Sequence, residues 1–281
     1  MAFIITSDST CDLGPYAQER DIVVLPLQVH LDSASYYDGV DIQPQDIFDF
    51  VAKTKILPKT SAPSIGEYEE FFAKQLQNAD GVLHFNISSK CSGSCSFARA
   101  AAESFGGKVR VIDSEALSSG QGLLVMKAAD LRDAGKTIDE VEQEINQVKK
   151  HVNTSFVPDT LDYLHKGGRV SGMVKVAAGM FKIHPLIYMQ GGALIPGKKY
   201  RGKMTMCIDR YAEDLKELYP SYDKTRCFVT HSCASKELVD LAKAKVKELF
   251  DFDEILETTA GSIVTSHCGQ GTLGILFIYE E

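Results

Sequence analysis

The sequence of 281 residues has no apolar run approaching the roughly 20 residues that a helix needs to cross a bilayer. Its first ten residues, MAFIITSDST, also lack a cationic stretch followed by a sustained apolar segment, which a secretory signal requires. Both absences argue against stable membrane insertion. They favour a cytoplasmic protein.

Closely paired cysteines are missing as well. The seven cysteines include no CxxC pair, so a reducing compartment fits better than a disulfide framework. Cys91 and Cys95 are four positions apart and would share one face of a helix. The residues that could complete a zinc site with them are His231, Cys233, His267 and Cys268. Because structural zinc sites usually show tight paired spacings, we expect small buried thiols and no metal.

Positive charge and nucleotide motifs are also scarce. The net charge is -8 and the pI is about 5.4, so nucleic acid is a poor candidate as a partner. No P-loop occurs. The Gly269-x-Gly271-x-x-Gly274 spacing leads into an apolar strand-like run and the end of the chain, whereas a dinucleotide fingerprint opens a helix. The ligand is therefore expected to be small, and no cofactor is predicted.

What the chain does have is a regular alternation of β-rich and helical segments before residue 152. The predicted strands are Phe3 to Thr6, Ile22 to Leu31, Gly81 to Ile87 and Lys108 to Asp113. The predicted helices are Pro44 to Thr54, Ile65 to Gln77, Ser96 to Phe105, Ser118 to Ala134 and Thr137 to Lys150. This alternation predicts a three-layer α/β/α domain with a mainly parallel sheet over residues 1–152.

After about residue 152 the pattern changes to short strands with fewer helices, which predicts a second α/β domain with a mixed sheet over residues 153–281. A hairpin turns at Gly191-Gly192, and CFVTHS reads as a strand. The predicted helices are Gly172 to Phe181, Arg210 to Leu218 and Lys236 to Leu249. A ligand is expected at and beyond the interface between the two α/β domains.

The segment Asn86 to Arg99, NISSKCSGSCSFAR, joins a strand to a helix through a turn of small residues. The first N–H groups of a helix have no intrahelical partner and carry partial positive charge, so Ser92 and Gly93 suit a carboxylate or a phosphate. The alternative is that these serines only cap the helix.

Three further segments offer side chains for the same site. Thr60 and Ser61 lie upstream of a capping-box spacing and supply hydroxyl donors. His267 lies between two strand-like runs, before glycines that permit close backbone approach, although a locally satisfied histidine is the alternative. Arg169 follows a helix-like segment that Gly167 would end, and it is either a surface residue or an anion ligand.

Taken together, six motifs in order resemble the DegV family of bacterial fatty-acid-binding proteins over the full chain. They are Asp8-Ser9-Thr10 with Asp12-Leu13, Thr60-Ser61-Ala62-Pro63-Ser64, Ile87-Ser88-Ser89 with Ser92-Gly93, Asp113-Ser114, Leu164-His165-Lys166-Gly167-Gly168-Arg169, and His267-x-Gly269-x-Gly271. The sequence departs from the common pattern at several positions, among them Cys91 for leucine and Cys95 for tyrosine.

The resemblance implies that the chain binds one long-chain fatty acid, tail inward, with the carboxylate at Thr60 and Ser92, His267 nearby, and Ser61 and Gly93 lining the same place. It also implies that a separate fatty acid kinase phosphorylates the bound acid for phospholipid synthesis. Arg169 would belong to the surface that contacts this kinase.

An enzyme is the competing hypothesis. Ser92 as nucleophile and His267 as base would make an acyl esterase or thioesterase, with Asp8 or Asp113 as a conjectural third member. The sequence lacks the Gly-x-Ser-x-Gly elbow of such enzymes.

Overall fold

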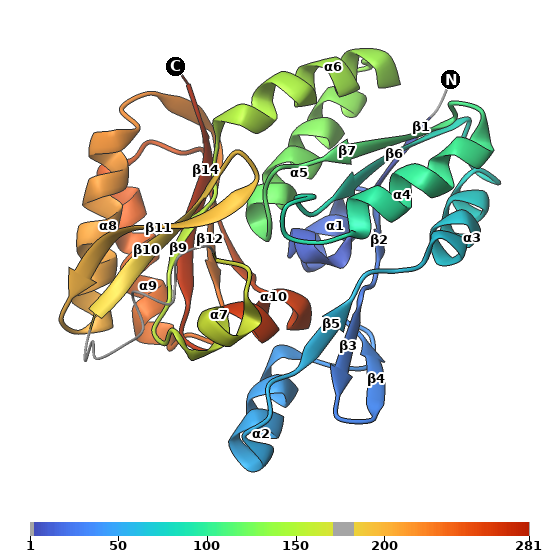
Figure 1. The fold of residues 1–281 in the computed structure, drawn as a ribbon. Coiled ribbons are helices and arrows are strands. Elements are labelled where there is room, and N and C mark those ends of the chain that lie inside the picture. The colour runs from blue at the N-terminus through green and yellow to red at the C-terminus, as the bar shows by residue number, and fades with distance from the viewer. Residues whose placement is uncertain (1–2, 171–182, 281) are drawn as a thin grey trace.

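The computed structural model describes residues 3–170 and 183–280, and its architecture confirms the predicted fold class. A parallel sheet lies in the first part of the chain and a mixed sheet in the second, with helices on their faces (Figure 1). We refer to the elements before residue 152 as the N-terminal half and to the rest as the C-terminal half. The predicted domain boundary between residues 152 and 153 stays a prediction.

The sheet of the N-terminal half has four parallel strands. In spatial order they are β2 (Ile22–Leu25), β1 (Phe3–Asp8), β6 (Gly81–Asn86) and β7 (Val109–Asp113). The helices of this half are η1 (Ser9–Cys11), α1 (Pro15–Glu19), α2 (Pro44–Thr54), α3 (Ile65–Gln75), α4 (Ser94–Ala102), η2 (Glu103–Phe105), α5 (Ser119–Asp133), α6 (Ile138–Val148) and η3 (Lys149–His151). The prediction for α2 is confirmed at both ends. The other predicted helices are found with shifted ends.

The two faces of this sheet pack against different helices because successive strand residues point to opposite sides. Ile5 and Leu83 lie in one cluster with buried residues of α5 and α6. Val82 lies in another with the aromatic rings of Tyr68 and Phe72 on α3. The result is the predicted three-layer arrangement.

The single strand predicted over Ile22 to Leu31 is wrong. The chain leaves the parallel sheet after Leu25, passes through Pro26 and enters a second sheet at Gln28. Proline has no N–H for a central strand ladder, which explains the break. The strands of this small antiparallel sheet are β4 (Ala34–Tyr37), β3 (Gln28–Leu31) and β5 (Lys59–Ser61).

The C-terminal half contains the mixed sheet, in the spatial order β11-β10-β9-β14-β12-β13, with β8 also paired to β14. Its strands are β8 (Val152–Asn153), β9 (Ser155–Val157), β10 (Ile183–Gln190), β11 (Ala193–Arg201), β12 (Tyr222–His231), β13 (Glu254–Thr259) and β14 (Leu273–Tyr279). Its helices are α7 (Asp162–Gly167), α8 (Met204–Leu218), α9 (Lys236–Leu249) and α10 (Ser262–Cys268). The hairpin predicted at Gly191-Gly192 is confirmed by the pairing of β10 with β11.

Three details of this half differ from the sequence predictions. Helix α8 begins at Met204, six residues before the predicted start, because Cys207 and Ile208 are buried on the same side as later core residues. Helix α7 is capped by Gly168, with φ of 68°, and not by Gly167. The region around His267 is helical. The predicted helix Gly172 to Phe181 lies outside the described residues.

Helix α5 joins the two halves. Ten of its fifteen residues are buried, on all sides of the helix, because it packs against β1 and β6 of one sheet and β8 and β14 of the other. Its glycines permit close approach, since a Cβ on Gly120 would lie 2.0 Å from Oγ1 of Thr154. The two sheets therefore share part of one core, which includes Phe228 and Leu276.

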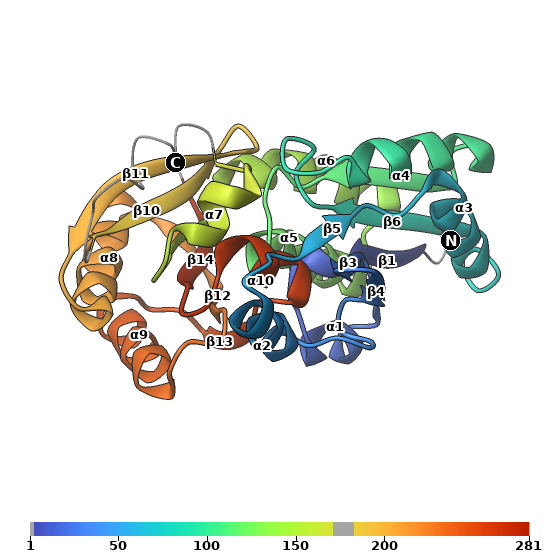
Figure 2. The same cartoon turned by 60° about the horizontal axis from the view of Figure 1, so that its bottom comes forward.

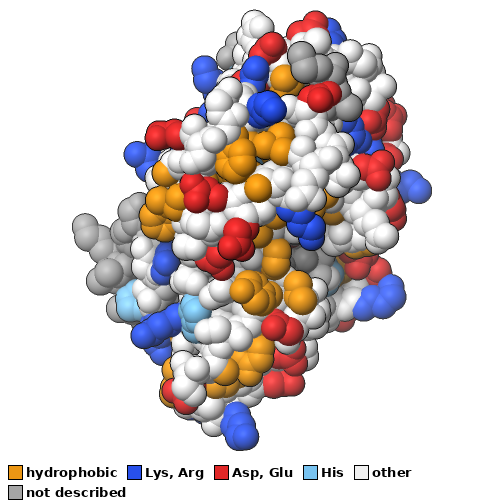
Figure 3. Space-filling view, turned by 90° about the vertical axis from the view of Figure 1, so that its right-hand side faces the viewer, with side chains coloured by type: hydrophobic (Ala, Val, Ile, Leu, Met, Phe, Trp, Pro, Cys, Tyr) orange, Lys and Arg blue, Asp and Glu red, His pale blue; other side chains and the backbone are white. Residues whose placement is uncertain are grey.

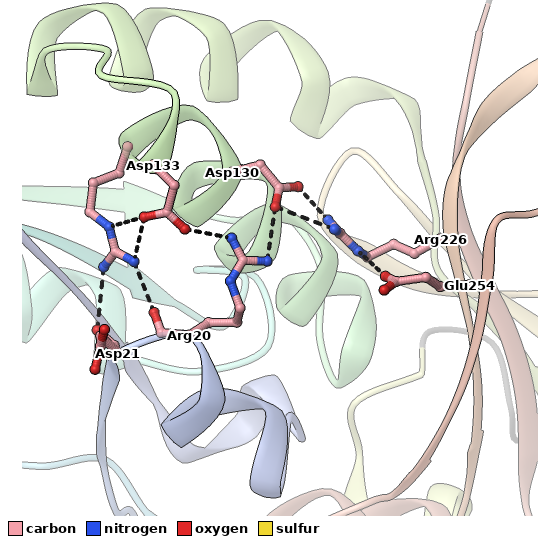
Figure 4. A network of polar contacts seen from close by, with 7 residues as sticks. Arg20, Asp21, Asp130, Asp133, Arg226 and Glu254 are labelled. Carbon is pink, nitrogen blue, oxygen red and sulfur yellow. Dashed lines mark hydrogen bonds and ion pairs between the residues drawn. The ribbon is translucent and has the colours of Figure 1, made fainter.

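An ion-pair network crosses the same junction (Figure 4). Asp130 on α5 forms ion pairs with Arg20 of the N-terminal half, at 2.9 Å, and with Arg226 on β12, at 2.6 Å. Arg226 is 8% exposed and also lies 3.4 Å from Glu254. A guanidinium with two carboxylate partners satisfies its buried charge.

The surface carries charges of both signs. On the face in Figure 3, lysine and arginine side chains lie among aspartates and glutamates, and no basic patch extends across the described residues drawn there. None of the helices in ranges 3–170 and 183–280 has the length and apolar character that a bilayer crossing requires.

Candidate functional site

A cavity of about 610 Å³ lies at the junction of the two halves. Its lining passes from exposed residues, such as Lys90 and Phe97, to almost fully buried ones, such as Ser155 and Leu276. The larger aliphatic and aromatic residues that line it are Leu27, Ile87, Phe97, Leu117, Phe156, Leu164, Leu194, Ile263, Val264 and Leu276. This size and lining are typical of a pocket for a small apolar ligand.

The hydroxyl groups deep in the cavity are already paired within the protein. Ser155 contacts Tyr211, Thr230 contacts Thr258 at 2.7 Å, and Ser232 contacts Thr265 at 3.0 Å. These side chains therefore need no hydrogen bond from a ligand. The inner part of the cavity suits an apolar tail.

Thr60 and His267 meet at the cavity. The hydroxyl of Thr60, on β5, lies 2.9 Å from Nε2 of His267, on α10. The two residues are 207 positions apart and come from different halves of the chain. The structure thus brings together two of the predicted site residues.

His267 is held in its neutral form. Burial, together with the positive charge of Arg169, lowers the pKa of its imidazole from 6.5 to about 4. Its buried Nδ1 has no hydrogen-bond partner among the described residues. Gly167 leaves room for the ring, since a Cβ there would lie 3.0 Å from Nδ1.

Ser92 and Gly93 line the same cavity at the start of α4. The Ser92 hydroxyl oxygen accepts from the backbone N–H of Ser94 at 3.2 Å, and its own proton has no acceptor among the described residues. The turn is fixed by buried carboxylates, because the N–H of Ile87 donates to Asp8 and that of Ser89 to Asp113. A free hydroxyl donor is thereby presented on a rigid turn.

Ser61 also lines the cavity, but its hydroxyl is engaged elsewhere. It lies 2.9 Å from Nε2 of His30 on the neighbouring strand β3. Because Thr60 and Ser61 are successive strand residues, their side chains point to opposite faces of the small sheet. Thr60 is the better placed of the two to meet a ligand.

Two cations lie at the exposed side of the cavity. Arg169 and Lys90 both belong to its lining and both are exposed. Arg169 donates to the carbonyl of Gly167 at 2.6 Å. An anion at Thr60 and Ser92 would therefore experience positive charge at the entrance.

Cys91 and Cys95 lie in the segment from Asn86 to Arg99, which we call the serine-rich turn, and they do not form a metal centre. Burial raises the pKa of Cys91, which lines the cavity, and of Cys95 to about 11 in each case. No group of three or more His, Cys, Asp or Glu among the described residues is placed to hold a metal ion. The thiols stay protonated at neutral pH, so they are poor ligands and weak nucleophiles.

The geometry does not support the hydrolase alternative. No hydrogen bond joins Ser92 to His267 in the described residues, and Nε2 of His267 is occupied by Thr60. No carboxylate meets Nδ1, where a triad requires one. Asp8 is bound by Thr10, Asn86 and Gln121 instead.

The sequence did not predict which residues form the inner wall. Phe156 on β9, Leu194 beside the hairpin turn, and Leu117 before α5 come from separated segments. Nothing in their local sequence distinguishes them from ordinary core residues. Only the packing of the two sheets reveals them.

The sequence model of the DegV family, described as an uncharacterised protein family, matches residues 2–280. The chain belongs to the DegV family. A DegV domain-containing protein of Deinococcus radiodurans is 32% identical, with 98% of each chain covered.

Solved structures of similar proteins share the whole fold. A DegV family protein from Thermus thermophilus, described by its fatty acid binding, superposes with a TM-score of 0.93 at 28% identity over 100% of both chains. A stearic-acid-binding protein from Eubacterium ventriosum superposes with a TM-score of 0.84 at 25% identity, covering 99% of this chain and 98% of its own. The predicted family membership is thus confirmed.

Proposed function

We propose that this DegV protein binds one long-chain fatty acid, with the acyl tail in the cavity and the carboxylate at Thr60, Ser92 and His267. Gly93 and Ser61 complete the wall around the carboxylate. The observation that carries the proposal is the Thr60–His267 contact of 2.9 Å at the edge of an apolar cavity. Relatives described as fatty acid binding supply the substrate class.

The energetics are consistent with a few neutral donors at the head group. A sixteen-carbon acid has about 14 methylene groups, and burying each contributes about 0.8 kcal/mol. Tail burial can therefore supply most of the affinity. The hydroxyls of Thr60 and Ser92 then orient the carboxylate without the desolvation cost of a buried cation.

We further propose that the chain is a cytoplasmic carrier and not an enzyme, and that a separate fatty acid kinase phosphorylates the acid it holds. The exposed position of Arg169 at the cavity supports its role in the kinase contact. Arg169→Ala is expected to retain fatty acid while slowing phosphorylation when kinase and ATP are added. Loss of retained acid in this variant would instead place Arg169 in the head-group site.

The decisive test is identification of the ligand. Protein expressed in bacteria is analysed by native mass spectrometry and by solvent extraction. A long-chain fatty acid at close to one per chain is the expected result. The proposal fails if no acid is extracted and the delipidated protein also does not bind added palmitate or stearate. Turnover of a chromogenic acyl ester would refute the carrier assignment.

A further inference from the structure

Helix α10 belongs to the C-terminal half by sequence but is anchored to the N-terminal half at both ends. It lies between β13 and β14 in the chain, yet it contacts α2, β3, β5 and η1. Figure 2 shows α10 beside α2 and β5. Its last turn carries His267, which contacts Thr60. Its first turn meets two buried carboxylates of the N-terminal half, Asp38 and Asp12.

Asp38 holds the first residue of the helix. Its Oδ1 accepts from the backbone N–H of Ser262 at 2.6 Å, and its Oδ2 accepts from the hydroxyl of Ser9 at 2.8 Å. Asp38 is only 5% exposed. It directly follows β4, in the same small sheet that carries Thr60.

Asp12 holds the residue before the helix. Its Oδ1 accepts from the N–H of Gly261 at 2.8 Å, and its Oδ2 accepts from the hydroxyl of Ser118. Gly261 is required to be small, because a Cβ there would lie 2.9 Å from Asp38 and 3.1 Å from Asp12. The two carboxylates therefore form a close-fitting clamp on the backbone at Gly261 and Ser262.

This clamp fixes the distance between His267 and Thr60, which hold the carboxylate in the proposed function. Helix α10 has seven residues, so it spans about 10 Å at 1.5 Å per residue and is too short to bend appreciably. Asp38 and Asp12 hold the start of this short helix, and they thereby determine where His267, in its last turn, lies relative to Thr60. Thr60 lies in the small sheet and Asp38 directly follows its strand β4, so the residues that contact the two ends of α10 are connected through this sheet.

We propose that Asp38 and Asp12 are positioning residues for the fatty-acid carboxylate, acting through α10 to hold His267 against Thr60. This inference rests on the proposed function. Burial raises the pKa of both carboxyls, that of Asp12 well above its usual range. Keeping two acids buried is costly, which favours a role beyond filling the junction.

The test is a double-mutant cycle on palmitate affinity with Asp38→Asn, His267→Ala and the combined variant. Asparagine keeps the shape of the side chain but has only one acceptor oxygen, whereas Asp38 accepts from both Ser262 and Ser9. Asp38→Asn is expected to weaken binding about tenfold in the wild-type background and less than about twofold when His267 is already absent, because coupled neighbours are not additive.

Asp223→Asn is the matched control. Asp223 also accepts a hydroxyl and an amide hydrogen bond, from Thr225, and it pairs with Lys127 at 3.0 Å; none of these partners belongs to α10. Its replacement is expected to leave affinity within about twofold in both backgrounds. An equal loss from Asp38→Asn with and without His267 would overturn the inference.

A measurement without ligand separates this inference from the proposed function. In the apo protein, ring ¹⁵N chemical shifts report the pKa and hydrogen bonding of His267. Asp38→Asn is expected to shift its pKa and Asp223→Asn to leave it unchanged. If wild type does not bind fatty acid, the proposed function fails, and unchanged His267 shifts in Asp38→Asn overturn the positioning role.

If Asp38→Asn does not fold, Ser9→Ala provides a milder change to the same clamp. It removes one donor to Asp38 and one acceptor for the N–H of Leu27. Ser9→Ala is expected to weaken palmitate binding about threefold in the wild-type background and less when His267 is already absent. Its absence in a folded Ser9→Ala protein overturns the inference.

Discussion

The Thr60 hydroxyl is the single group whose removal should cost the most at the carboxylate site. Thr60→Val keeps the side-chain shape while removing a donor and leaving Nε2 of His267 without its 2.9 Å partner. Each lost donor costs about 0.5 to 3 kcal/mol, so we expect affinity for palmitate to fall about tenfold. Isothermal titration of delipidated protein would measure it.

Ser61→Ala is the matched control for this change, because the Ser61 hydroxyl is paired with His30 on the other face of the small sheet. We expect a loss of less than about threefold. An equal or larger effect from Ser61→Ala would show that the Ser61 hydroxyl contributes at least as much to carboxylate binding as the Thr60 hydroxyl.

His267 should make the stability of the apo protein depend on pH. Burial lowers its pKa to about 4 in the folded state, while the unfolded state takes up the proton near 6.5. The unfolded chain therefore binds more protons between these values, and stability falls as pH decreases from about 6.5 to 4. The full difference amounts to roughly 3 kcal/mol.

The measurement is urea unfolding of wild type and His267→Gln at pH 7, 5.5 and 4. The free energy of unfolding should fall more steeply with decreasing pH in wild type than in His267→Gln, because glutamine does not titrate. His84, whose pKa is lowered to about 3 by burial, is common to both proteins and cancels. A constant difference would contradict the neutral, buried state of His267.

At the scale of elements, the tip of the β10–β11 hairpin is fitted to the serine-rich turn. The hydroxyl of Ser88 donates to the carbonyl of Gly192 at 2.6 Å, and a Cβ on Gly192 would lie 2.7 Å from that hydroxyl oxygen. Gly192→Ala should destabilise the protein by about 2 to 3 kcal/mol, from a left-handed φ of 79° and from the collision.

Gly191 in the same turn provides the control. It also has a positive φ, of 55°, but a Cβ there meets nothing within 4 Å. Gly191→Ala should therefore cost only about 1 kcal/mol. Thermal unfolding would compare the variants, and equal costs would show that the Ser88 contact contributes nothing.

The helices and strands could be predicted from the sequence more easily than the sheets that the strands join. Regular patterns with clear ends, such as Pro44 to Thr54 and Lys236 to Leu249, gave α2 and α9 at the predicted residues. The apolar run Ile22 to Leu31 does not reveal that its two parts join different sheets. Helix α10 was missed because its seven residues, SIVTSHC, are short and rich in β-branched side chains.

The candidate site divides in the same way. Ser92 and Gly93 lie at a helix start that suits an anion or a simple cap, and Thr60 lies upstream of a capping-box spacing, so each segment alone left both interpretations open. Their meeting with His267 depends on a contact 207 positions apart in the sequence, which local patterns do not encode. The engagement of Ser61 by His30 and the clamp on α10 likewise arise only from the assembled fold.

At the scale of the whole molecule, the network around Asp130 should help to hold the two halves together. Asp130→Ala leaves Arg226, 8% exposed, with only its 3.4 Å contact to Glu254. We expect a loss of about 2 kcal/mol in the free energy of unfolding, less than for a fully buried pair because Asp130 is 31% exposed. Urea unfolding would measure it.

Asp251→Ala removes the partner of Lys224 in an exposed pair and is the control. Surface pairs contribute little, so this variant should unfold like wild type. If both variants lose the same stability, the position of Asp130 at the junction has no special importance.

The anchoring of α10 has a consequence for the synthesis of the protein. Asp12, Asp38 and Thr60 are made 207 to 249 residues before the groups that they contact, which are the backbone of Gly261 and Ser262 and the side chain of His267. At the usual 5 to 20 residues per second, the wait is on the order of ten seconds or more. During translation the nascent chain therefore carries two carboxylates that lack their backbone donors at Gly261 and Ser262, and the carboxylate site is complete only after α10 has been made.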